Sequence, residues 1–164
     1  RSYHLDGTLS CFIKSPKGFV VPSYCFAITY MDGTVHCSNP GRHLVESYTT
    51  DGEFVASFGK SGTEPGAFSG CCNPAILTPS NNGELLTSEK GIPRISCYRT
   101  DGKFRSVLLD SKALGGGHDA YDVRVMKDKL IVACGKKVSV FQYDKRLSQF
   151  TACGQCNQDC PLKI

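Results

Sequence analysis

The cysteines are the residues with the clearest capacity for chemistry. Ten occur among the 164 residues. Three of them stand close together near the C-terminus, in the spacing C-x2-C-x3-C-P: Cys153, Cys156 and Cys160, followed by Pro161. Thiolates at such spacing suit zinc and Fe–S clusters, because both are soft enough to prefer sulfur. The sequence equally allows one disulfide within this tail, or free thiols, and these alternatives stay open.

This tail is similar to the last three cysteines and the proline of a bacterial ferredoxin cluster motif. The first ligand of that motif would fall at Phe150, which cannot bind iron. A cluster or a zinc ion therefore needs a fourth thiolate, supplied by Cys71, by Cys72 or by another chain.

A second sulfur-rich segment is "SGCCNP", with Cys71, Cys72 and Asn73 ahead of an apolar run. Three interpretations compete for the adjacent thiols. In the first, the thiols are small buried side chains or one of them forms a disulfide with a nearby cysteine. In the second, Cys71 and Cys72 form a strained disulfide with each other. In the third, the thiols bind a metal or cofactor. The vicinal disulfide is strained because neighbouring Cα atoms lie only about 3.8 Å apart.

Charged residues gather in "EKGIPR", where Glu89, Lys90 and Arg94 fall within one short connection. Glu89 and Arg94 are expected to form an ion pair that braces the loop. The functional alternative is that this cluster contacts an anion or another polar ligand. We therefore list Cys71, Cys72, Asn73, Glu89, Lys90 and Arg94 as candidate ligand-binding residues.

No catalytic constellation is recognised. The four histidines are scattered without metal-ligand spacing: His4, His36, His43 and His118. "GGGHD" at 115–119 has no helix after it, so a phosphate loop is not expected. Neither a nucleophile elbow nor a kinase motif occurs. We expect a protein without catalytic activity and assign no catalytic residue.

Composition indicates a globular chain of one domain or part of one. The net charge of +4 is spread evenly, which argues against nucleic-acid binding. No apolar run approaches the roughly 18 residues that a membrane span needs. The chain opens at Arg1 within sequence typical of mid-domain, so we expect that an upstream part is not included.

The elements that must position these residues come as repeats. "YHLDGTL", "YTTDGEF", "YRTDGKF" and the degenerate "FQYDKRL" share an aromatic residue three positions before an Asp, and Leu or Phe three after it. Their aspartates, separated by 45, 50 and 43 residues, are Asp6, Asp51, Asp101 and Asp144. Each phrase predicts a hairpin with a tight turn.

A second hairpin is predicted between successive copies, at 26–38, 75–88 and 121–134. Each repeat then holds four short strands. Four-stranded antiparallel units at this period are typical of β-propeller blades. The sequence therefore predicts an all-β propeller, with at most one helical turn near 108–116.

The repeat resembles the NHL repeat, the blade unit of a six-bladed β-propeller. The marks are Arg42, the Tyr48–Gly52 turn, Phe58-Gly59 and the connector from Pro65 to Pro74. "GCCNP" and "TSEKGIPRI" are similar to bacterial NHL-like proteins. The resemblance implies that residues 1–151 form the C-terminal half of such a propeller, followed by a cysteine-rich tail at 152–164, in a periplasmic or exported protein. The missing N-terminal half or a second chain would close the ring.

Antiparallel geometry places the Asp-Gly turns at one end of each blade and the connectors at the other. The connector face is defined by the segments 39–43, 69–74, 89–94 and 134–137. We expect a scaffold that binds a partner protein or small ligand on this face, near the central channel. The alternative is a redox protein with an Fe–S or zinc site on the tail. A weaker alternative is a propeller hydrolase or lyase.

Overall fold

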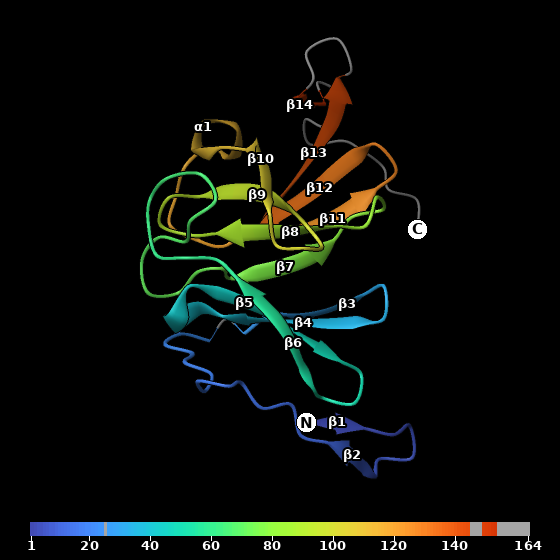
Figure 1. Cartoon of the computed structure of the whole chain (residues 1–164). Coiled ribbons are helices and arrows are strands. Elements are labelled where there is room, and N and C mark those ends of the chain that lie inside the picture. Colours follow the sequence, from blue (N-terminus) through green and yellow to red (C-terminus); the bar gives the residue numbers. More distant parts are fainter. Residues whose placement is uncertain (25, 145–148, 154–164) are drawn as a thin grey trace.

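The computed structural model describes residues 1–24, 26–144 and 149–153. These residues form a two-stranded hairpin and three four-stranded antiparallel sheets, which confirms the predicted all-β repeats (Figure 1). Strand order follows chain order within each sheet, as in simple meanders. The expected helical turn is present as α1 (Ser111–Leu114).

The strands correspond closely to the predicted hairpins. The N-terminal hairpin consists of β1 (Ser2–Tyr3) and β2 (Leu9–Cys11). The first sheet contains β3 (Ile28–Met31), β4 (Thr34–Asn39), β5 (Leu44–Thr49) and β6 (Phe54–Phe58), with the short η1 (Pro40–Arg42) between β4 and β5. The second sheet contains β7 (Ile76–Pro79), β8 (Glu84–Glu89), β9 (Arg94–Arg99) and β10 (Phe104–Leu109). The third contains β11 (Asp122–Met126), β12 (Lys129–Cys134), β13 (Lys137–Asp144) and β14 (Gln149–Ala152).

Local turn chemistry explains where the strands reverse. Asp32 and Gly33, between β3 and β4, have φ angles of 49° and 80°. Two consecutive positive φ values are what a type I′ hairpin turn requires, and Asp-Gly is among its preferred pairs. The turn between β3 and β4 is therefore determined by two neighbouring residues, independently of the rest of the fold.

The three sheets fan outward from their first strands. β3, β7 and β11 lie next to one another, while β6, β10 and β14 lie on the outside (Figure 1). The Thr78 hydroxyl on β7 donates a 2.9 Å hydrogen bond to the Val123 carbonyl on β11, which joins the second and third sheets at this inner edge. This arrangement is that of neighbouring propeller blades.

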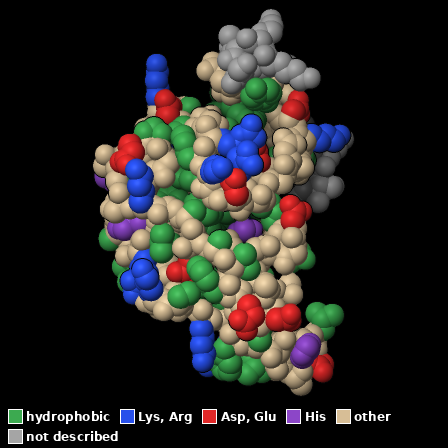
Figure 2. All heavy atoms as spheres, in the orientation of Figure 1, with side chains coloured by type: hydrophobic (Ala, Val, Ile, Leu, Met, Phe, Trp, Pro, Cys, Tyr) green, Lys and Arg blue, Asp and Glu red, His purple; other side chains and the backbone are tan. Residues whose placement is uncertain are grey.

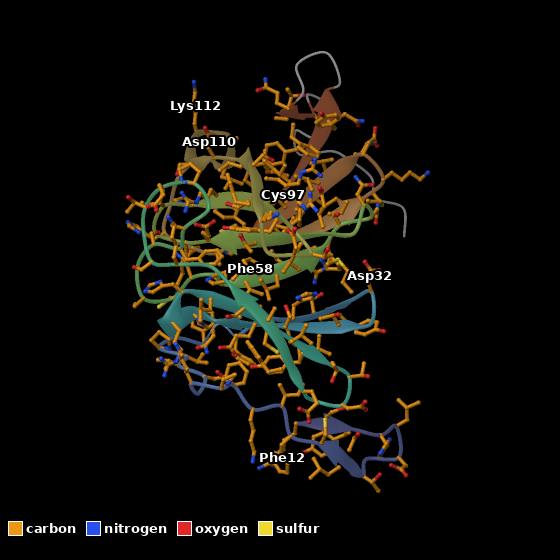
Figure 3. The ribbon with its side chains drawn as sticks, in the orientation of Figure 1. Phe12, Asp32, Phe58, Cys97, Asp110 and Lys112 are labelled. Carbon is orange, nitrogen blue, oxygen red and sulfur yellow. The ribbon has the colours of Figure 1, made fainter. Side chains whose placement is uncertain are left out.

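Apolar side chains fill the space between successive sheets. One cluster joins the first and second sheets around Phe68 and Tyr98, which are almost completely buried, and Phe58 lies against it (Figure 3). The ring centroids of Phe58 and Tyr98 are 4.9 Å apart. A second cluster, around Ile95 and Leu130, joins the second and third sheets. The middle strands of the second sheet, β8 and β9, are buried along almost their whole length because this sheet packs between the other two.

The surface carries both signs of charge. Lys and Arg side chains are interspersed with Asp and Glu over the face drawn in Figure 2, in keeping with the even charge distribution of the sequence. Among the residues that the structure describes, no helix has the length and apolar character needed to cross a bilayer.

Two of the cysteines that lie within strands differ in burial. Cys97 on β9 is 3% exposed, and burial together with Glu84 raises its pKa to about 12. Cys11 on β2 is only half-buried, because the two-stranded hairpin that carries it has less structure packed around it.

Candidate functional site at the connector face

A groove of about 600 Å³ opens at the ends of the three innermost strands. Ile28 at the start of β3, Ile76 at the start of β7 and Asp122 at the start of β11 line it, so every sheet contributes. Cys134 at the end of β12 and Gly135 in the turn that follows also line the groove. The predicted connector face and the groove thus coincide at this turn and at the entries to the first strands.

The groove is apolar with one charged corner. Phe26 and Ile28 are 43% and 60% exposed, which leaves hydrophobic surface accessible in the groove. At the corner, Arg124 donates a 2.8 Å hydrogen bond to the Asp122 carboxylate. Sequence reasoning did not select Arg124. The sequence pattern that could have identified Arg124 is the alternation along β11, which puts Asp122 and Arg124 on the same side of the strand.

Tyr24 connects the groove to the charged connector. Its ring is 91% exposed and lines the groove. The Lys90 ammonium lies 5.6 Å from the ring centroid, within cation–π distance. Lys90, predicted as a ligand contact, is therefore placed at the rim, whereas Tyr24 was not singled out from sequence.

Cys71 and Cys72 lie at the same rim as free thiols, with their Sγ atoms 3.1 Å apart. Cys71 is exposed and Cys72 is half-buried. The hydrogen bond from Cys71, and the neighbouring Ser23 and Lys90 side chains, lower the pKa of Cys72. The same contact with Cys72 raises the pKa of Cys71. The two thiols therefore differ in character although they are adjacent in sequence.

Asn73 fixes the backbone around the thiols. Its buried side chain donates to the Ser69 and Lys90 carbonyls at 2.7 Å each, and its Oδ1 accepts from the Lys90 N–H at 2.9 Å. A single amide thus ties the segment that carries Cys71 and Cys72 to the loop after β8. Because these hydrogen bonds are all made to protein groups, they indicate a structural role for Asn73. Contact between Asn73 and a ligand stays a prediction.

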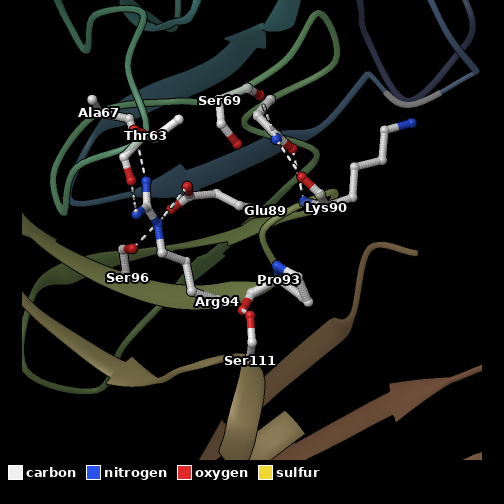
Figure 4. A network of polar contacts seen from close by, with 10 residues as sticks. Thr63, Ala67, Ser69, Glu89, Lys90, Pro93, Arg94, Ser96 and Ser111 are labelled. Atoms are coloured by element: carbon white, nitrogen blue, oxygen red, sulfur yellow. Dashed lines mark hydrogen bonds and ion pairs between the residues drawn. The ribbon is translucent and has the colours of Figure 1, made fainter. Parts of the chain in front are cut away.

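Glu89 and Arg94 form the ion pair predicted from their spacing, with 2.7 Å between Arg94 Nε and Glu89 Oε2 (Figure 4). Their side chains are 0% and 6% exposed. Ser96 donates to the second oxygen of Glu89 at 2.8 Å, and Arg94 donates to the carbonyls of Thr63 and Ala67. Burial raises the pKa of Glu89, and Ser96 and Arg94 oppose that rise. The pair braces the connector between the first two sheets, and its contact with a ligand remains a prediction.

Only part of the predicted metal site lies within the residues that the structure describes. Cys153 follows β14 and is half-buried, whereas Cys156 and Cys160 lie outside the described residues. Within the described ranges, no group of three or more His, Cys, Asp or Glu side chains is arranged to hold a metal ion. Zinc or Fe–S ligation by the tail, with Cys71 or Cys72 as fourth ligand, stays a prediction.

Comparison with known proteins supports the fold. No family model matches the chain, and no curated protein matches it. Among solved structures, hydrazine synthase of Kuenenia stuttgartiensis aligns with a TM-score of 0.55 and 11% identity over 82% of this chain and 38% of that one. Virginiamycin B lyase from Staphylococcus aureus aligns with a TM-score of 0.55 and 13% identity over 92% of this chain and 53% of the other.

Both neighbours are propeller-like, so the chain has a fold consistent with part of a β-propeller. It spans between about a third and about half of their length. At this identity the likeness concerns fold alone, because propellers host many unrelated activities. The six-bladed NHL assignment stays a prediction.

Proposed function

We propose that this protein is a non-catalytic propeller scaffold that binds a small amphipathic ligand at its connector face. The observation that carries the proposal is the groove of about 600 Å³ at the inner ends of all three sheets. Its position at the first residues of strands from all three sheets distinguishes it from a hollow of similar volume between the second and third sheets. Strands position Ile28, Ile76 and Asp122, whereas Tyr24 and Phe26 come from the segment before β3.

The chemistry of the lining defines the ligand class. Phe26, Ile28 and Ile76 offer an apolar wall, and Arg124 offers guanidinium N–H groups at one corner. Lys90 adds a second cation at the rim through its position over Tyr24. The ligand that fits best has an apolar body and an anionic group. Arg124 also pairs with Asp122, so the anionic group of the ligand would meet its remaining N–H groups. Binding rather than catalysis is proposed because the sequence carries no recognised catalytic motif.

A fluorescent probe with this chemistry tests the proposal. We would titrate the protein with 1-anilinonaphthalene-8-sulfonate, which combines an aromatic body with a sulfonate, and follow its emission. Ile28→Glu places a carboxylate in the groove at a position 60% exposed, so the fold tolerates it. We expect saturable binding by the unmodified chain and a loss of affinity of at least about tenfold in the variant, since burying an unpaired charge against the probe is unfavourable.

Val55→Glu is the matched control, because Val55 is 57% exposed on the outer strand β6. It should bind the probe like the unmodified protein. Equal weakening in both variants, or no effect in either, would show that the probe does not occupy the groove and would overturn the proposal.

A further inference from the structure

The thiol pair at the rim has a geometry that the proposed ligand site does not use. The two Sγ atoms, 3.1 Å apart, need to approach by only about 1 Å to reach the bond length of a disulfide. Cys71 is exposed, so a reagent in solvent has access to the pair. Adjacent cysteines of this kind can react either with each other or with an external sulfur.

The surroundings hold the pair in place and polarise one member. Asn73 ties the backbone on both sides of the loop through its three hydrogen bonds to Ser69 and Lys90. Ser23 and Lys90 both favour the thiolate of Cys72, whereas Cys71 feels the Lys90 charge without a contribution from Ser23. A neighbouring cation favours thiolate, which is the reactive form of cysteine.

We propose that Cys71 and Cys72 form a thiol–disulfide exchange site whose substrates are exposed disulfides, with Cys72 as attacking sulfur and Cys71 as resolving sulfur. The Cys72 thiolate attacks a disulfide RSSR, forms a mixed disulfide and releases one thiolate RS⁻. Cys71 then loses its proton to solvent, attacks the Cys72 sulfur and releases the second RS⁻. The two cysteines are oxidised by two electrons in total, and RSSR is reduced to two thiols after protonation.

Chain geometry makes a disulfide between Cys71 and Cys72 easy to reduce. The Cα atoms of neighbouring residues are about 3.8 Å apart, below the range of about 4.4–6.8 Å that is usual for disulfides. A strained, exposed disulfide is more readily reduced than a structural one. The pair is therefore suited to cycling between dithiol and disulfide, whatever the groove binds.

Tryptic mapping after incubation of the full chain with oxidised glutathione tests the site. Cleavage at Lys60 and Lys90 releases residues 61–90, whose only cysteines are Cys71 and Cys72. In the unmodified protein this peptide should lose two hydrogen atoms and carry no glutathione. In Cys71→Ser it should retain one glutathionyl group, because the resolving thiol is gone. In Cys72→Ser, glutathionylation should be at least about tenfold slower, because the attacking thiol is gone.

An internal control lies in the same digest. Residues 95–99 contain only Cys97, which is buried and has a raised pKa of about 12, so this peptide should stay unmodified. A pair that stays reduced in the unmodified protein would overturn the proposal, as would a stable mixed disulfide there. Equal rates for the two single variants would overturn the assignment of roles. The readout is thiol modification, so it does not depend on ligand binding in the groove.

Discussion

The first and second sheets each have a buried polar brace at the same place, but they build it from different residues. In each, the turn between the second and third strands must be fastened to the connector that precedes the sheet. Pairing places Asn39 opposite Leu44 in the first sheet and Glu89 opposite Arg94 in the second. The equivalent of Glu46 in the first sheet is Ser96 in the second, so the buried carboxylate has changed position.

The partners of the two carboxylates differ in charge. Glu46 accepts hydrogen bonds from neutral groups, the Asn39 amide at 3.0 Å, the Ser15 hydroxyl at 2.9 Å and the Tyr48 hydroxyl. Glu89 is instead paired with the Arg94 guanidinium. Asn39 and Arg94 each reach the preceding connector, through Gly18 in one sheet and through Thr63 and Ala67 in the other. The fold therefore requires a satisfied polar brace at this place, and not one fixed set of residues.

The largest expected effect comes from breaking the charged brace. Arg94→Leu leaves Glu89 buried without its cation, and removal of one partner of a buried pair typically costs about 3–5 kcal/mol. Arg42→Leu removes an exposed arginine that donates to the Gly18 and Lys17 carbonyls in the connector before the first sheet, and should cost about 1 kcal/mol or less. Urea unfolding of both variants measures the difference.

A triple variant gives the control for this comparison. Glu89→Asn, Arg94→Leu and Ser96→Glu together copy the first sheet into the second. It should recover part of the stability lost in Arg94→Leu. The carboxylate of Glu89 is gone, and the new carboxylate at position 96 can accept hydrogen bonds from neutral groups, as Glu46 does. A cost below about 1 kcal/mol for Arg94→Leu alone would contradict the interpretation of this pair as the brace.

A smaller difference is expected at the equivalent Asp-Gly turns. Gly52 and Gly102 both have positive φ, 90° and 81°, so an alanine at either costs about 1–2 kcal/mol in backbone strain. A Cβ at Gly102 would also lie 2.6 Å from Phe58 Cβ, whereas at Gly52 the nearest atom is 3.1 Å away. Gly102→Ala should therefore lose about 1–3 kcal/mol more than Gly52→Ala, as overpacking does. Equal losses in thermal or urea unfolding would show that Phe58 moves aside freely.

The smallest effect is a pH dependence confined to the first sheet. His36 is 3% exposed, and its Nδ1 lies 2.9 Å from Oγ of its cross-strand partner Ser47. At the equivalent positions of the second sheet, Leu86 is paired with Cys97. Burial lowers the pKa of His36, and Asp32 opposes this. The unfolded chain therefore binds the proton first as pH falls, so stability is lost from about pH 6.5 downward until the folded pKa is passed.

The variant His36→Leu copies the second sheet at this position. It should flatten the stability profile between about pH 5 and 7 while leaving the rest of the acid response unchanged. Urea midpoints measured across this interval provide the test. An unchanged slope would assign the dependence to other groups.

Much of the fold could be predicted because its signals are local. Each Asp-Gly phrase specifies a turn by the conformational freedom of two residues, and apolar alternation on both sides specifies the strands. The ion pair of Glu89 and Arg94 was also predictable, because both ends of one short connection must face each other across a hairpin. The candidate site was harder. Lys90, Cys71 and Cys72 were selected from their motifs, and their contact with a ligand stays a prediction. Tyr24 and Arg124, which line the groove, were not selected because neither belongs to a motif.

The sequence by itself determined the hairpins, their order in groups of four and the end of each group at which the connectors lie, because these follow from φ preferences and from the period of two along a strand. Only the tertiary structure decided what those connectors do. Packing three sheets about their first strands buried Glu89 with Arg94 and left Ile28 open in a groove. It also set Lys90 beside Cys72, since burial and proximity between distant segments depend on how the sheets stack.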